Sequence, residues 1–469
     1  MTTEKLWKKR VFWCYGSAAT AFGIKNNAFS YLLLLYCTEV LGIAGFKASI
    51  ALAIAMIWDA VSDLLLGHWS DKTSSRLGRR HPFMYAALLV LPISFYLLFD
   101  PAIELHEDNA FMYVLLMCLL IRTGTTLFEM PSTALLPDLE KDYDRRNQWL
   151  SLRYFFGWYG GNGIHVINMG LWVGVYGVGV QTGYSIYGLV GALIIGASIL
   201  ISSLGTQKVA AAMPPPTEPF QFTEIWHEIR QIAQSVTNAN FLWLFVYSLI
   251  VGAAGGMSTA LYLYNVTYFF EFDGPQIAVT GIFVFASPAI AYFLAPVLGR
   301  NLGKKRAAIT ALVGAIFLYP IPYLMTLSGL WPESGSWNSL LIYSFFVMTE
   351  VVGFIVGGVM LDSMMADVVE DSEVKTNRRS EGLFYAARSF AGKAVSALGI
   401  ILAGSIVSLV GMDGMQSVAD MTDAMRIDLA SFFLPAYCGL YFLAIFLISR
   451  YRIDRDTHNM NLEALAGKA

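Results

Sequence analysis

The sequence has few charged residues. Asp, Glu, Lys and Arg make up 14% of the 469 residues, whereas hydrophobic residues make up 56%. A soluble domain carries roughly 25% charged residues, so this chain has too few to cover a surface that faces water. A disordered chain is also excluded, because disorder requires low hydrophobicity. The composition therefore predicts an integral membrane protein and argues against an ordinary cytosolic enzyme.

Clustered cysteines and an excess of positive charge are also missing. Cys14, Cys37, Cys118 and Cys438 lie apart in apolar runs, without a CxxC or Cys/His cluster. This spacing suggests neither a zinc site nor a disulfide framework. The formal net charge of −3 argues against a nucleic-acid-binding protein. No phosphate-binding glycine loop and no nucleophile motif stands out, so we expect neither an enzyme nor a cofactor.

The chain is rich in long apolar runs. A helix needs about 20 apolar residues to cross the hydrocarbon core of a bilayer. Twelve segments satisfy this length, at 11–41, 46–68, 82–100, 109–135, 150–176, 183–204, 240–270, 275–299, 307–328, 338–365, 381–411 and 427–450. We therefore expect an all-α integral membrane protein with twelve transmembrane helices.

The basic residues predict the orientation of the chain. With twelve spans both termini lie on one side, and that side holds 24 of the 31 Lys and Arg residues. The opposite loops hold only Lys47 and Arg426. Because loops rich in Lys and Arg face the cytoplasm, we expect both termini there. The expected location is a plasma membrane, in a bacterium the inner membrane.

An internal repeat divides the chain into halves. The motif Tyr36-x-x-Glu39-x-x-Gly42 ends the first span, and Tyr268-x-x-Glu271-x-x-Gly274 ends the seventh. The longest cytoplasmic connection lies between the halves and contains three consecutive prolines, which a helix interior does not tolerate. We expect two pseudo-symmetric six-helix bundles, a linker and a cytoplasmic tail, at residues 1–204, 240–455, 205–239 and 456–469. This pattern is typical of the major facilitator fold, with a substrate site between the halves.

Ionisable side chains within spans are candidate functional residues, because each costs roughly 2.5–3.5 kcal/mol to insert. Asp59 and Asp63 of the second span are four residues apart and project from one helix face. Two such carboxylates repel each other unless a cation lies between them or one is protonated. They predict a site for Na⁺ or H⁺. The alternative is that both pair with Lys or Arg of neighbouring helices.

Three other span residues are candidate substrate contacts. Glu129 precedes a proline in the fourth span, and Arg122 lies two turns earlier on a similar face. A carboxylate accepts hydrogen bonds from substrate hydroxyls, and an arginine donates them. The alternative for both is a bridge that packs helices, and His165 is similarly either a packing residue or a substrate contact. Trp58 is the aromatic side chain that we single out, because sugar rings stack on aromatic faces.

Several motifs resemble one transporter family. The segment Trp58-Asp59-Ala60-x-x-Asp63, then Gly67, Asp71-Lys72-Thr73 and Arg76-x-Gly78-Arg79-x-x-Pro82, resembles the signature of the glycoside–pentoside–hexuronide:cation symporters. This is the melibiose permease family of the major facilitator superfamily. The second half agrees at Met365-Ala366-Asp367, at Arg378 to Gly382 and at Lys393. The resemblance covers most of the chain.

The resemblance implies roles for particular residues. In that family the aspartates of span two bind the coupling cation, which matches Asp59 and Asp63. An acidic residue of span four takes sugar hydroxyls, which matches Glu129. An arginine of span five and a lysine of span eleven line the cavity, which matches Arg153 and Lys393.

Two departures from the family pattern argue against a galactoside substrate. Lys25-Asn26 matches a Lys-Asp pair of span one, but Asn26 replaces the acid that binds sugar in the family. Thr133 stands where the family has an aromatic platform. Lys25 and Asn26 remain candidate substrate-binding residues.

We expect a monomeric, cation-coupled symporter of a sugar or glycoside that works by alternating access, with Na⁺ or H⁺ as the coupling ion. The alternative is a sodium-dependent lysophospholipid transporter of the same superfamily. That branch shares the aspartates of span two and the lysine of span eleven. A lipid substrate requires an apolar cleft that opens between helices to the membrane.

The basic loop after span two is a candidate gate. We expect four residues to lie on the cytoplasmic face and to bridge to groups near spans four and eleven in the outward-open state: Asp71, Arg76, Arg79 and Arg80. Asp138 and two further aspartates after span four are the candidate partners. Exposed pairs contribute only about 0–1 kcal/mol each, so the alternative is that these charges merely set orientation.

Overall fold

A computed structural model describes residues 3–140, 142–212, 239–376, 381–415, 417–453 and 455–466. The helices of the first half are α1 (Thr3–Ser17), α2 (Ala19–Asn27), η1 (Ala28–Leu32), α3 (Leu33–Glu39), α4 (Gly45–Lys72), α5 (His81–Phe99), α6 (Glu107–Ala134), α7 (Leu136–Leu139), α8 (Tyr143–Leu171), α9 (Val173–Tyr176) and α10 (Gln181–Ala210). Those of the second half are α12 (Ala239–Tyr264), η2 (Asn265–Phe269), α13 (Gly274–Leu302), α14 (Lys304–Leu318), α15 (Ile321–Leu327), α16 (Trp337–Thr376), α17 (Glu381–Val410), η3 (Val418–Asp420), α18 (Asp423–Ser449) and α19 (Arg455–Ala466).

The helices confirm the expected all-α membrane architecture. Within the described residues, nine helical segments are long and apolar enough to cross a membrane. The run from α1 to α3, helix α8 and helix α17 bring the crossings to twelve, six in each half. The first and seventh crossings both contain a π-helical turn, η1 and η2. The two halves therefore share a local irregularity as well as a helix count.

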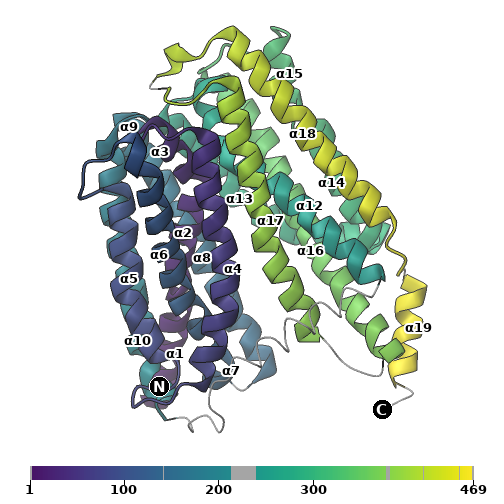
Figure 1. Ribbon diagram of the computed structural model, residues 1–469. Coiled ribbons are helices and arrows are strands. Elements are labelled where there is room, and N and C mark those ends of the chain that lie inside the picture. The colour runs from purple at the N-terminus through teal and green to yellow at the C-terminus, as the bar shows by residue number, and fades with distance from the viewer. Residues whose placement is uncertain are drawn as a thin grey trace.

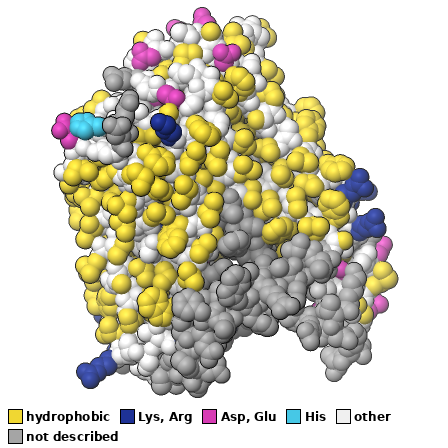
Figure 2. Space-filling view, in the orientation of Figure 1, with side chains coloured by type: hydrophobic (Ala, Val, Ile, Leu, Met, Phe, Trp, Pro, Cys, Tyr) yellow, Lys and Arg dark blue, Asp and Glu magenta, His cyan; other side chains and the backbone are white. Residues whose placement is uncertain are grey.

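The outer surface of the protein is apolar. Leu89, Tyr292 and Phe293 are 68%, 74% and 72% exposed. Hydrophobic side chains cover a broad middle zone in Figure 2, and several Asp and Glu side chains gather at the upper end of that view. Large exposed apolar areas are rare on soluble monomers. The surface is the one expected of a protein whose middle contacts lipid.

Each half forms its own bundle. In the first half α4 packs on α6, α5 packs on α6 and α10, and α2 packs on α8. The α2–α8 pair is close because Gly23 faces Gly161, where an added Cβ would collide with the Gly23 carbonyl. In the second half α12 packs on α17 and α18, and α16 packs on α13 and α14. In the first half, the contact between Gly23 and Gly161 holds the first and fifth crossings, α2 and α8, with their backbones in contact.

The two bundles meet chiefly along two pairs of helices. Helix α4 packs against α17, and α8 packs against α13. Hydrogen bonds join the halves at the end where α3 finishes, from Tyr268 Oη to Glu39 Oε2 at 3.0 Å and between the hydroxyls of Thr38 and Tyr264 at 2.6 Å. Figure 1 shows the bundles close together at this end and diverging toward the end that holds both termini. We call these two the closed end and the terminal end.

Some boundaries differ from the sequence expectation. Helix α10 continues to Ala210, past position 204 where the apolar run stops. Helix α16 continues to Thr376, well beyond position 365. Both helices extend into polar sequence because a helix that leaves the membrane needs no apolar side chains to keep its backbone hydrogen bonds. Residues 213–238 of the expected linker lie outside the described residues.

Candidate functional site

A cavity of about 480 Å³ lies in the first half. Helix α2 and turn η1 contribute Asn26, Asn27, Ser30 and Tyr31, α6 contributes Glu129 and Thr133, and α8 contributes Arg153, Tyr154, Trp158 and Asn162. Three of the side chains that the sequence predicted for substrate binding, Asn26, Glu129 and Arg153, therefore come together on one cavity. Crossings one, four and five supply its polar wall.

Arg153 is held firmly in this wall. Its side chain donates to Thr133 Oγ1 at 2.9 Å and to Ser132 Oγ at 3.4 Å. Its guanidinium also lies 4.9 Å from the ring centroid of Tyr15 and 5.2 Å from that of Phe22. Cation–π contacts of this kind strengthen when the charge is removed from water, and Arg153 is only 8% exposed. The arginine is thus oriented before any ligand arrives.

The neighbouring residues of the first crossing have opposite environments. Asn26 is exposed to the cavity, whereas Lys25 is buried, with 2% of its surface exposed. Consecutive helical residues point in directions about 100° apart, which lets Asn26 face the cavity while Lys25 is buried between helices. Of the pair that the sequence placed in the substrate site, Asn26 lines the cavity directly and Lys25 lies within the bundle.

Helices α4 and α6 share a ladder of polar contacts beside this cavity. Arg122 Nη1 lies 3.3 Å from Asp59 Oδ2, and Thr126 Oγ1 donates to Asp63 Oδ1 at 2.9 Å. Both pairs join residues 63 positions apart, which is the register of two parallel helices. Ser62 adds a hydroxyl 3.0 Å from Thr126 Oγ1. We call these contacts the Asp59–Arg122 rung and the Asp63–Thr126 rung.

The remaining predicted site residues lie elsewhere. Trp58 is 40% exposed and donates its Nε1 to Thr123 Oγ1 at 2.9 Å, and it is not among the described side chains that line the cavity. His165 is 6% exposed, with its ring 5.6 Å from that of Tyr31. The side chain of Lys393 lies outside the described residues.

Sequence reasoning missed part of the cavity wall. Asn27 and Tyr31 are four residues apart, as are Tyr154 and Trp158. Asn27 directly follows Asn26 and Tyr154 directly follows Arg153, and residues four apart share a helix face, so the helix faces that start at these two neighbours carry the missed side chains. Uncharged polar and aromatic side chains carry too little insertion cost to stand out in a span.

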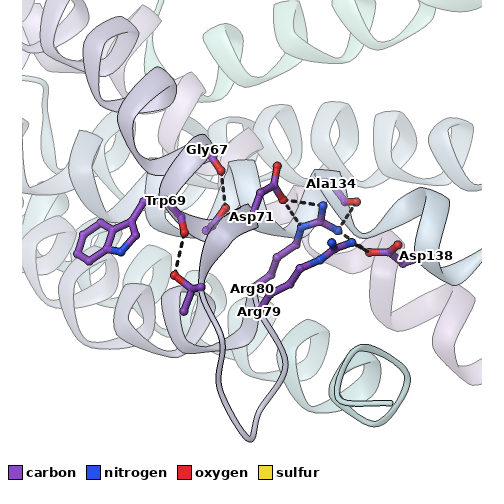
Figure 3. Close-up of polar contacts among 9 residues, drawn as sticks. Gly67, Trp69, Asp71, Arg79, Arg80, Ala134 and Asp138 are labelled. Atoms are coloured by element: carbon purple, nitrogen blue, oxygen red, sulfur yellow. Dashed lines mark hydrogen bonds and ion pairs between the residues drawn. The ribbon is translucent and has the colours of Figure 1, made fainter. Parts of the chain in front are cut away.

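A second polar cluster lies at the terminal end of the first half (Figure 3). Arg80 pairs with Asp71 at 2.7 Å and with Asp138 at 2.6 Å, and Arg79 pairs with Asp138 at 2.9 Å. Arg80 also donates to the Ala134 carbonyl at 2.6 Å. These contacts tie the loop before α5 to the ends of α4 and α6 and to α7, within one bundle. Arg76 is exposed and has no ion-pair partner among the described residues.

The second half has a cavity of different character. It has a volume of about 290 Å³ and is lined by α13, α14 and α16. Ile290, Leu294 and Leu318 lie at its margin and are themselves 39%, 36% and 39% exposed. Glu350 is the one carboxylate among its lining side chains, and it accepts a hydrogen bond from Tyr437 Oη at 3.2 Å. This is an apolar cleft that reaches the outer face of the bundle.

Twelve crossings in two bundles, with a polar cavity in one bundle, define a membrane transporter of the major facilitator class. The family described as MFS/sugar transport protein matches residues 14–455. The chain belongs to this family, and the resemblance to the glycoside–pentoside–hexuronide:cation symporters is confirmed.

Several relatives are distant in sequence, but their similarity covers more than nine-tenths of this chain. An uncharacterized symporter, YnaJ of Bacillus subtilis, is 22% identical over 97% of this chain and 94% of its own. The raffinose carrier protein of Pediococcus pentosaceus is 24% identical over 92% of this chain and 69% of its own. The sodium-dependent lysophosphatidylcholine symporter 1 of Gallus gallus is 21% identical over 96% and 88%.

Solved structures share the fold. A bacterial homologue of the iron transporter ferroportin, in an inward-facing state, superposes with a TM-score of 0.66 at 12% identity, over 96% of this chain and all of that one. The Escherichia coli xylose transporter XylE, in an inward-open conformation, gives 0.62 at 12% identity, over 98% and 99%. These likenesses establish the major facilitator fold.

Proposed function

We propose that the protein is a cation-coupled symporter of a sugar or glycoside. The observation that carries this proposal is the cavity of about 480 Å³ in which Glu129, Arg153 and Asn26 meet. A carboxylate, a guanidinium and an amide provide both acceptors and donors for a solute rich in hydroxyls. Aromatic rings on the same wall suit the apolar face of a sugar ring. The relative named as a raffinose carrier supports this substrate class.

The coupling cation, Na⁺ or H⁺, is proposed to bind at Asp59 and Asp63. Helix α6 carries both Thr126, which contacts Asp63, and Glu129, which lines the cavity. These residues are three positions apart, so a cation beside Asp63 and a substrate beside Glu129 would contact the same turn of helix. Binding of either ligand would then favour the other by the same factor, as linkage requires.

Transport is proposed to follow alternating access, with the two bundles rocking about the cavity. The hydrogen bonds between Glu39 and Tyr268 and between Thr38 and Tyr264 hold the closed end. Asp71, Arg79 and Asp138, together with Arg80, are proposed to regulate the terminal end, which we assign to the cytoplasm with both termini. One chain contains both bundles, so a monomer suffices.

A specific observation favours a second candidate, sodium-dependent transport of a lysophospholipid. The cleft beside Ile290 and Leu318 is apolar and is bordered by side chains on the outer surface of the second bundle. It would accept an acyl chain. One of the relatives is named as a sodium-dependent lysophosphatidylcholine symporter. The cleft lies within one bundle and away from Glu129, so we rank this function second.

Uptake into proteoliposomes tests both candidates. Radiolabelled raffinose, lactose and lysophosphatidylcholine are compared under an inward Na⁺ gradient, an inward H⁺ gradient and neither. We expect one of the sugars to accumulate only when a cation gradient is imposed. Accumulation of lysophosphatidylcholine alone would favour the second candidate. Equilibration of the sugars without any gradient dependence would contradict symport.

A further inference from the structure

A buried carboxyl group lies at the closed end, where the two bundles meet. Glu39 is the last residue of α3 and is 4% exposed. Tyr268 Oη lies 3.0 Å from Glu39 Oε2, and Thr38 Oγ1 donates to Glu39 Oε1 at 2.9 Å. Tyr268 belongs to the second half, so side chains of both bundles enclose this carboxyl group. Separation of the bundles at the closed end would remove Tyr268 and open Glu39 to water.

The charged groups around Glu39 are negative. They are Asp413 and Asp420, in the segment between α17 and α18. Within the part of the chain that the structure describes, Glu39 forms no ion pair. Its other titratable neighbours are three tyrosines that are themselves buried, Tyr184, Tyr264 and Tyr268. An ionised carboxylate is far more costly to bury without a cation than the neutral acid, and nearby like charges add to that cost.

The matching glutamate of the second half is paired with an arginine. Glu271 stands at the same place in the repeated motif and pairs with Arg426. Arg426 is the fourth residue of α18, and the fourth residue of α10, the corresponding helix of the first half, is Tyr184. The second half therefore supplies a guanidinium to its glutamate, whereas the corresponding position near Glu39 carries a phenol.

The hydrogen bonds around Tyr268 also indicate a proton on Glu39. The tyrosine hydroxyl carries one hydrogen, but two acceptors lie within its reach, Glu39 Oε2 at 3.0 Å and the Met415 carbonyl at 3.2 Å. A protonated Glu39 would donate to Tyr268 Oη, and Tyr268 would donate to the Met415 carbonyl. An ionised Glu39 would leave one of two buried acceptors without a hydrogen of its own, which costs free energy.

We propose that Glu39 is a proton-binding site of the closed end, occupied while the bundles are closed there and emptied when they separate. Closing then takes up one proton, so a higher pH favours the state that is open at this end. The closed end lies opposite the side that we assign to the cytoplasm, so the proton exchanges with the outer solution. The site is separate from the proposed coupling site at Asp59 and Asp63. The inference rests on the proposed alternating access, because the closed end must open.

Spin labels on the purified full chain in lipid nanodiscs measure the opening. Labels at Ile103 and Trp337, two exposed positions of the closed end, are compared in buffers from mildly acidic to alkaline. In the wild type, the ratio of the longer to the shorter distance component should rise with pH, by at most about tenfold per pH unit for one proton. Glu39→Gln mimics the protonated acid, so it should stay closed and lose most of this dependence. The matched control is Glu271→Gln, which removes the ion-paired glutamate of the repeat and should keep the pH dependence of the wild type.

Infrared spectroscopy detects the proton directly. A protonated carboxyl group has a C=O stretch that is separate from the bands of a carboxylate. The difference spectrum between the wild type and Glu39→Gln should contain this stretch where the labels report the closed state, and the stretch should fade over the pH range in which they report opening. Because glutamine has the shape and the neutrality of the protonated acid, Glu39→Gln should also fold and melt close to the wild type.

Four results would overturn the proposal. They are a difference spectrum without the carboxyl stretch, a wild-type distance distribution that does not change with pH, an unchanged pH dependence in Glu39→Gln, and failure of this neutral variant to fold. Failure of the proposed symport is recognised separately. If no cation gradient drives uptake of the sugars, symport fails, while the label and infrared results still decide the proton site. If the sugars accumulate but the closed end opens equally at every pH, symport stands and the role of Glu39 fails.

Discussion

The two halves of the protein have the same plan of helices but different cavities. The cavity of the first half is bordered by Glu129, Arg153 and Asn26. The cavity of the second half is bordered mainly by aliphatic side chains, with Glu350 as its carboxylate. The closed-end contacts also differ, because Tyr36 bonds to Gln181 in its own half at 3.2 Å, while its repeat counterpart Tyr268 bonds across to Glu39.

This difference shows that two halves with the same backbone plan can carry different side chains and serve different roles. The backbone plan follows from burying apolar side chains and satisfying every peptide group inside the membrane, and both halves meet that demand in the same way. Polar side chains within a span carry a cost that only pairing or function offsets. Among the described side chains that line the two cavities, most of the polar ones belong to the first half, where we propose that substrate and cation bind.

The largest effect should come from the carboxylates of the coupling site. Asp63→Cys or Asp59→Cys should abolish cation-driven accumulation of the substrate, because each variant removes a carboxylate that we propose binds the coupling cation. Accumulation in proteoliposomes under a Na⁺ or H⁺ gradient is the measurement. Asp428→Asn, which removes an exposed carboxylate from α18 in the second half, is the control. Full gradient-dependent uptake in both cysteine variants would show that the site is elsewhere.

The same substitution in the two cavities should have unequal consequences. Glu129→Gln should weaken substrate binding about 10- to 100-fold, since a hydrogen bond to a charged group contributes roughly 1.5–3 kcal/mol. Glu350→Gln should leave substrate affinity nearly unchanged. The affinities come from concentration-dependent uptake of the sugar that the panel identifies. Equal losses in the two variants would mean that both cavities serve the substrate.

The two tyrosines of the repeat provide a test of the closed end. Tyr268→Phe removes a hydrogen bond that crosses between the bundles, at a cost of about 0.5–1.5 kcal/mol. It should shift the population several-fold toward the state that is open at this end. Tyr36→Phe removes a bond within one bundle and should not.

Spin labels at two exposed positions of the closed end report this shift. Ile103 lies between α5 and α6, and Trp337 begins α16. The distance distribution between labels at these sites should gain a longer component in Tyr268→Phe alone. A longer component of equal size in both tyrosine variants would mean that the hydrogen bond between Tyr268 and Glu39 does not control the opening of the closed end.

The smallest effect should come from the terminal end. Arg79 is 29% exposed at its side chain and pairs with Asp138, so its contact is worth about 0–1 kcal/mol. Arg79→Gln should change the transport rate by at most a fewfold and leave substrate affinity alone. Arg76→Gln removes an exposed charge of the same loop and should alter neither. If a variant that combines Arg76→Gln and Arg79→Gln transports as the wild type does, these charges serve only to set the orientation of the chain in the membrane.

The sequence by itself was sufficient for the fold and for three of the polar side chains that line the candidate cavity. Apolar length marks each crossing, because a span of the bilayer demands it. Charged residues in spans stand out for the same reason, and Glu129 and Arg153 were found by that signal. The i, i+4 spacing of Asp59 and Asp63 placed both carboxylates on one face, and both contact α6.

The partners of those charges were decided only by the tertiary structure. The sequence left open whether Asp59 faces a mobile cation or a neighbouring arginine, and the packing of α4 on α6 brings it to Arg122. It likewise did not show that Lys25 turns inward while Asn26 faces the cavity. A span's composition records that a polar group is inside the membrane. The choice of partner depends on the rotation and register of one helix against another, and those are set jointly by contacts from segments far apart in the chain.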